Sequence, residues 1–195
     1  MRRFTIARGP LSAILVALVL LIYITTREVY REAPSGYTWV HSGKIRARLL
    51  VPYGWVFREK REKDADIVLI TKDAGGKPGS VSPGLTITVL RDCDKTTGMK
   101  PSVYTEEFIN EMKLASSWHG KIESIRQNDR FKGLGGFFRS DDEESGTIVQ
   151  FVLAIGNDDT GTLYVAIFRS KEDEWEAAWS AGQTIIDNLA LDKGA

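Results

Sequence analysis

An uncharged, mostly apolar run close to the start of the chain, residues 9–26, limits what this sequence can be more than any other feature. As a helix these 18 residues would reach roughly 27 Å, enough to cross a thin bilayer. Residues 11–21 are apolar on every side rather than along one stripe, which suits lipid better than the core of a globular domain. The sequence therefore predicts a transmembrane helix over residues 9–26, preceded by a basic segment, residues 1–8.

The charges around this run predict its orientation. Three arginines precede it, whereas the arginine that directly follows it, Arg27, is offset at once by Glu28. By the positive-inside rule the N-terminus stays in the cytoplasm and the rest of the chain crosses the membrane. A cleaved secretory signal is the alternative, but the run ends without the small residues that cleavage needs. We therefore expect a signal anchor in the inner or plasma membrane and an extracytoplasmic, for example periplasmic, C-terminal domain.

The rest of the chain is long enough for one domain. Residues 27–38 are polar and include Pro34-Ser35-Gly36, which is typical of a linker, and we expect residues 39–195 to form the domain. Without the four arginines and one glutamate of the first 30 residues, the rest of the chain has 22 basic and 25 acidic side chains, so its net charge is slightly negative. This balance offers no basic surface for nucleic acid, so that class of partner is excluded.

Hydrophobic periodicity predicts a domain of short strands and two helices. The expected strands are 45–51, 67–71, 85–90, 122–127, 134–140, 147–155 and 162–169, and the charged stretch 58–66 is expected to be a loop. The sequence Gly156-Asn-Asp-Asp-Thr-Gly161 predicts a hairpin turn between the last two strands. A first helix is expected to begin with Ser102 as its cap, and a last helix with Ser170. Trp175, Trp179 and Gly182 then share one face of the last helix.

Few residues point to chemistry. His119 follows the first helix, and as a catalytic base it would need a nucleophile or acid that no local motif supplies. We expect no catalytic residue of a known motif, no metal site and no cofactor, because only two histidines and one cysteine occur in the chain. Trp39 and Trp118, expected in loops, are candidates for a binding surface together with His119.

The order of these parts resembles that of the PsbP-like domains, named after an extrinsic subunit of the oxygen-evolving photosystem. The resemblance covers roughly residues 39–191 and rests on three segments, Leu50-Val51-Pro52-Tyr53-Gly54-Trp55, Tyr104-Thr105-Glu106-Glu107-Phe108 and Gly161-Thr162-Leu163-Tyr164-Val165-Ala166, followed by Trp175. It implies an α/β fold, an α/β/α sandwich with a mostly antiparallel sheet flanked by helices, here preceded by the transmembrane helix. It also implies an accessory or binding module without enzymatic activity. No photosynthetic role or metal site follows, because no motif position supports either.

Two functions stay open at this point. The first is a membrane-anchored accessory domain that binds a protein partner at the membrane surface, or a small ligand. The second is an envelope hydrolase with a site around His119, because catalytic groups assemble in space rather than along the chain.

Overall fold

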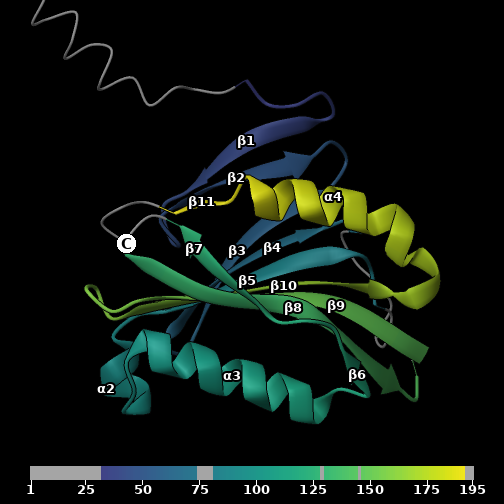
Figure 1. Ribbon diagram of the computed structural model, residues 1–195. Helices are drawn as coiled ribbons and strands as arrows, with labels where there is room; N and C mark the ends of the chain where they lie inside the picture. The colour runs from purple at the N-terminus through teal and green to yellow at the C-terminus, as the bar shows by residue number, and fades with distance from the viewer. Residues whose placement is uncertain (1–31, 74–80, 128–129, 145, 192–195) are drawn as a thin grey trace, which may run out of the picture. The chain divides into compact units, whose positions relative to one another are not determined.

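A large antiparallel sheet lies at the centre of the fold (Figure 1). In this computed structural model the described residues are 32–73, 81–127, 130–144 and 146–191. Within them the sheet has eight strands in the order β3-β4-β5-β10-β9-β8-β6, with β7 also pairing with β8. The strands are β3 (Val56–Glu62), β4 (Ala65–Thr71), β5 (Gly84–Leu90), β6 (Trp118–His119), β7 (Glu123–Gln127), β8 (Phe131–Asp142), β9 (Gly146–Asn157) and β10 (Thr162–Lys171).

A second, smaller sheet and the helices complete the layers. The small sheet has the order β1-β2-β11, with β1 (Tyr37–Ser42), β2 (Ala47–Pro52) and β11 (Ala190–Leu191). Helices α2 (Cys93–Thr97) and α3 (Pro101–Ala115) lie on one side of the large sheet, and the short 3₁₀ helix η1 (Glu172–Glu174) leads into α4 (Trp175–Asp187) on the other (Figure 1). The result is an α/β fold with a mostly antiparallel sheet, as expected.

Alternation along the strands explains why both faces of the sheet are covered. On β9, Leu153 and Ile155 belong to the core shared with α4 and the small sheet, whereas Val152 and Ala154 belong to a second core that contains Ile109 of α3. Because neighbouring side chains of a strand point to opposite faces, such a strand is apolar on both. Each face then needs its own cover.

Polar contacts attach the small sheet to the large one. The Tyr164 hydroxyl on β10 donates a hydrogen bond of 3.2 Å to the carbonyl oxygen of Ile45, just before β2. Arg91 donates to the carbonyl oxygen of Lys44 and lies 3.4 Å from a carboxylate oxygen of Asp66 on β4. These bonds hold the turn between β1 and β2 against the large sheet. The small sheet can therefore cover the core on the same side of the large sheet as α4.

Most predicted elements are confirmed, and several predictions about loops and caps are wrong. The predicted strands correspond to β2, β4, β5, β7, β8, β9 and β10, and the hairpin joins β9 to β10. The charged stretch 58–66 is not a loop: most of it belongs to the edge strand β3 and to the start of β4. Trp39 and Trp118 lie on β1 and β6 rather than in loops. Ser102 does not cap the first helix, because it is the second residue of α3, whose N-cap is Lys100. Ser170 does not cap the last helix, because it is a buried residue of β10.

The predicted transmembrane helix, residues 9–26, lies outside the described residues. None of the helices in the described ranges is long and apolar enough to span a bilayer. The compact unit that contains all the elements above is Pro34–Ala195, and β1 begins at Tyr37, two residues before the expected start of the domain.

Candidate functional site

The three residues singled out in the sequence do not form one site. Trp39 lies on β1 in the small sheet, where the guanidinium carbon of Arg48 is 4.7 Å from the centre of its ring. Trp118 and His119 make up β6 at the edge of the large sheet. Because they are neighbours on a strand, their side chains point to opposite faces. The three residues lie on separate surfaces, and a role of any of them in binding stays a prediction.

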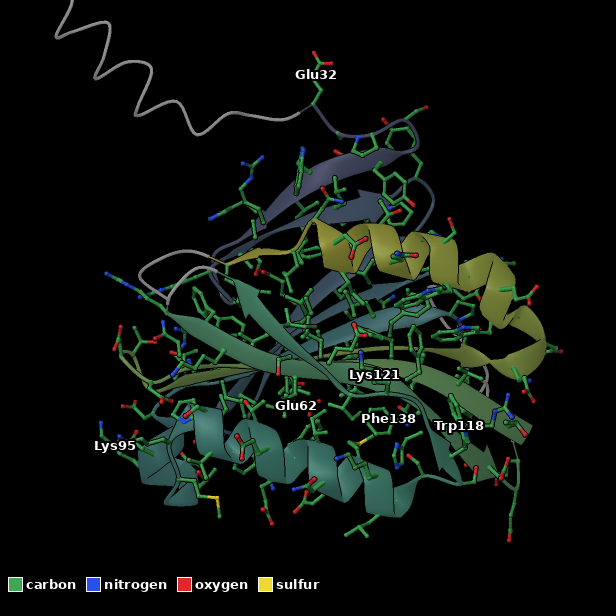
Figure 2. The ribbon with its side chains drawn as sticks, in the orientation of Figure 1. Glu32, Glu62, Lys95, Trp118, Lys121 and Phe138 are labelled. Carbon is green, nitrogen blue, oxygen red and sulfur yellow. The ribbon has the colours of Figure 1, made fainter. Side chains whose placement is uncertain are left out.

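Trp118 is the more exposed of the two candidate tryptophans, and it lies near the end of β8 (Figure 2). It is 53% exposed, and the guanidinium carbon of its cross-strand partner Arg139 is 6.0 Å from its ring centre. Arg139 also forms an ion pair with Glu172. The indole is thus held beside an arginine that is already paired, at an exposed edge of the sheet.

The surroundings of His119 contain no catalytic arrangement among the described residues. Its Nδ1 lies 3.0 Å from the carbonyl oxygen of Gly120, and its ring packs 6.4 Å from that of Phe138. The hydroxyl of Ser116 donates to the carbonyl of Met112, and that of Ser117 to the carbonyl of Arg139. Both serine hydroxyls close to His119 in sequence are therefore directed at backbone oxygens and not at the imidazole.

A groove lies between α4 and strands β7, β8 and β9. Its volume is about 480 Å³, within the range of small-molecule sites. We call it the α4 groove; it is lined by Glu123, Ile125, Phe137, Phe151, Leu153, Ile155, Trp179, Gln183, Ile186, Asp187 and Leu189. Eight of these eleven side chains are apolar, and the polar three are exposed.

Aromatic rings form one wall of the α4 groove. The ring of Trp179 lies 5.1 Å from those of Phe137 and Phe151, and it stacks on Trp175 at 5.1 Å with an angle of 13° between the planes. Ring pairs at such separations attract one another, so this wall is well packed. The periodicity of the last helix predicted that Trp175 and Trp179 face the core, and this is confirmed.

A glycine on β8 explains how side chains from β7 and β9 can approach each other in the opposite wall of the groove. A Cβ on Gly135 would lie 2.8 Å from Cδ1 of Ile125 and 3.3 Å from the ring of Phe151, both of which line the groove. With glycine at this position the two side chains can lie over β8 itself. Gly135 belongs to β8, so the strand predicted over residues 134–140 is confirmed.

The rim of the α4 groove is acidic. Glu123 comes from β7, and Gln183 and Asp187 come from the last two turns of α4. Nζ of Lys121 lies 3.4 Å from a carboxylate oxygen of Glu123, but both side chains are exposed, so this ion pair is weak. No lysine, arginine or histidine is among the residues that line the groove in the described part of the chain.

Other features of the described residues are weaker candidates for a functional site. Two smaller hollows lie beside α3, one of about 270 Å³ against β5 and β10 and one of about 230 Å³ against β7 and β8. The described ranges contain no group of three or more histidine, cysteine, aspartate or glutamate side chains that could hold a metal ion. Cys93 is buried, and burial raises the pKa of its thiol, which disfavours the reactive thiolate.

The layers and the groove define a small α/β domain of the PsbP-like fold with a candidate ligand site under its last helix. Among solved structures, the chain resembles cyanobacterial PsbP of Synechocystis sp. PCC 6803, with a TM-score of 0.54 and 13% identity over 83% of this chain and 95% of that one. It also resembles LpqN of Mycobacterium tuberculosis, with a TM-score of 0.50 and 14% identity over 79% of this chain and 89% of that one. At these identities the likeness shows the fold alone. No protein-family model matches the sequence, and no curated protein matches it either.

The sequence predicted the fold of the site but not the site. The α4 groove takes its lining from four separate segments of the chain, and its polar members Gln183 and Asp187 lie beside the predicted core face of the helix. A signal was present: Trp179, Gln183 and Ile186 recur at helical spacing, so an amide lies at the edge of the apolar stripe. Without the strand order, nothing in the sequence could show which strands this stripe meets.

Proposed function

We propose that this chain is a non-enzymatic accessory domain that binds the apolar part of a ligand in the α4 groove. The observation that carries the proposal is the groove itself, an open apolar concavity with a few polar groups at its rim. Sites of this shape and composition are the usual places where proteins bind small molecules. Each of the half-buried groups Ile125, Phe137 and Trp179 would gain further burial from an apolar ligand.

The proposal includes a location at the membrane. The apolar run 9–26 would hold the chain in the bilayer, with residues 1–8 in the cytoplasm and the domain on the other side. Anchoring raises the local concentration of the domain near lipids and near membrane proteins, among which we expect its protein partner. LpqN, which has a similar fold, is involved in cell envelope biogenesis, and this is compatible with such a location.

The hydrolase alternative receives no such support. It would need a nucleophile or an acid in contact with His119, whereas the neighbouring serine hydroxyls donate to backbone carbonyls. The imidazole itself is exposed at the sheet edge.

A substitution that fills the groove tests the proposal. Gln183 is exposed on α4 at the rim, so Gln183→Trp should fold normally while placing an indole across the opening. The matched control is Glu176→Trp, an exposed position of the same helix that does not line the groove. Native mass spectrometry of the full-length proteins, purified from their own membranes, would show whether a non-protein molecule remains bound.

We expect bound molecules in the unaltered protein and in Glu176→Trp, and at least roughly fivefold lower occupancy in Gln183→Trp, because the added ring displaces the ligand. Equal occupancy in all three proteins would place binding elsewhere. A complete lack of bound mass, even after addition of 1-octanol as an apolar probe, would contradict a binding function for the groove.

A further inference from the structure

The charge at the rim of the α4 groove is one-sided. Glu123 and Asp187 stand on opposite walls, one on β7 and the other on α4, and the described lining holds no basic side chain. Lys121 is the only cation paired with either of them in the described residues, at 3.4 Å and in contact with solvent. A ligand group placed between the two walls would therefore meet negative potential.

The end of α4 adds to this potential. Asp187 is the last residue of the helix, and the last turn contains no basic residue. The carbonyl groups at a helix C-terminus carry partial negative charge, so cations are favoured there and carboxylates are not. Asp187 is thus placed where its charge is unfavourable to the helix unless a positive group lies nearby.

The aromatic wall also suits a cation. Phe137, Phe151 and Trp179 line the same groove, and the π faces of such rings attract ammonium groups as well as apolar chains. An ammonium group at the rim would lie near the carboxylates, and an alkyl or aryl body would extend along the aromatic wall and cover Leu153 and Ile155, which also line the groove.

Resting on the proposed function, we infer that the ligand of the α4 groove is an amphiphilic amine: an apolar body with one cationic ammonium headgroup. The body fills the groove, and the headgroup lies between Glu123 and Asp187. Neutral amphiphiles bind through the body alone, and anionic amphiphiles are disfavoured by the two carboxylates. The groove therefore selects ligands by charge.

Three probes with one body and different headgroups separate these contributions: octylammonium, 1-octanol and octanoate. Binding to the full-length protein in phosphatidylcholine nanodiscs is measured by calorimetry, with the signal of empty discs subtracted. We expect octylammonium to bind about tenfold more tightly than 1-octanol and octanoate to bind more weakly than either. The preference should decrease as the salt concentration rises, because exposed charges are screened.

Variants without the two carboxylates test whether Glu123 and Asp187 cause the preference for octylammonium. In Glu123→Gln/Asp187→Asn, octylammonium should lose about tenfold in affinity and match 1-octanol, whose own affinity should stay the same. The control Asp173→Asn/Glu176→Gln removes two charges from η1 and α4 outside the groove and should leave all three affinities unchanged.

The outcomes separate this inference from the proposed function. If all three probes bind equally, or if the groove variant and the control behave alike, the charge selection is overturned and binding in the groove still stands. If none of the probes binds, the proposed function fails together with the inference.

Discussion

Gly182 lies in the middle of α4, where alanine would normally be the better helix former. A Cβ at this position would come within 2.7 to 2.8 Å of ring atoms of Phe168, a fully buried residue of β10. We predict that Gly182→Ala lowers the free energy of unfolding by about 1–3 kcal/mol, the usual cost of overpacking a core. Urea unfolding followed by tryptophan fluorescence measures this change.

The control for this prediction is Gly43→Ala, because no atom lies within 4 Å of the added Cβ there. That variant should unfold like the unaltered protein. An unchanged or increased stability of Gly182→Ala would show that α4 lies further from the sheet than described.

Cys93 gives a prediction about pH. Burial raises the pKa of its thiol; the hydrogen bond with Thr97 opposes this, and the carboxylate of Asp94 adds to it. The folded state therefore keeps the proton to higher pH than the unfolded state, whose thiol ionises near pH 8.5. Its contribution to stability is complete below that pH and is lost as the pH rises toward the folded-state pKa.

Unfolding free energies measured between pH 7 and 10 should thus decrease more steeply for the unaltered protein than for Cys93→Ala, which has no thiol to ionise. Parallel pH dependences of the two proteins would refute the raised pKa.

Single residues also show what the sequence could reveal. The spacing of Trp175, Trp179 and Gly182 was enough to predict the buried face of α4, because it follows from helix geometry alone. Ser102 and Ser170 were expected to cap helices because serine commonly does so. Whether a serine caps depends on where the chain turns, and the structure places Ser170 inside β10.

At the scale of the elements, α3 receives its cap from a distant loop. Asp158, in the hairpin between β9 and β10, accepts hydrogen bonds from the backbone N–H of Ser102 at 2.9 Å and from its hydroxyl at 2.7 Å. We predict that Asp158→Ala lowers the free energy of unfolding by about 1 kcal/mol, because an N–H of the first helical turn loses its partner.

Asp158→Asn should retain most of the stability, since an amide oxygen still accepts the bond from Ser102. Asp159→Ala, at the next position of the same loop, serves as the control and should be close to neutral. Thermal unfolding of the three variants measures the differences, and equal losses for Asp158→Ala and Asp159→Ala would contradict the cap.

Three of the strands missing from the sequence-based prediction lack a local apolar pattern. Most side chains of β3 are charged, and β3 forms an edge of the large sheet, where lysine, arginine and glutamate commonly discourage pairing with other chains. An edge strand of this kind lacks the apolar alternation by which strands are recognised. β6 and β11 contain two residues each, too few for any periodicity.

At the scale of the whole molecule, the predicted topology can be tested directly. We predict that alkaline phosphatase fused after Ala195 is active in cells, because residues 9–26 export the domain, and that a reporter requiring the cytoplasm is inactive at the same place. Removal of residues 1–30 should abolish the phosphatase activity. An active cytoplasmic reporter would overturn the proposed location.

The α4 groove is also a property of the whole molecule. It combines segments that begin near residue 123 and end near residue 189, and the pairing of β7 with β8 and of β8 with β9 brings them together. The sequence predicted most of these strands individually, but their order depends on long-range contacts that no local pattern encodes. The resemblance to PsbP-like domains predicted the fold and contained no information about the groove.

The most direct test of a ligand site under α4 is methyl-labelled NMR of the full-length protein in nanodiscs with 1-octanol. Binding in the α4 groove predicts nuclear Overhauser effects from the alkyl chain of the probe to the methyl groups of Ile125, Ile186 and Leu189. Effects confined to Val165 and Ile167, which line the hollow beside α3, would contradict it, because the probe would then bind on the other face of the sheet.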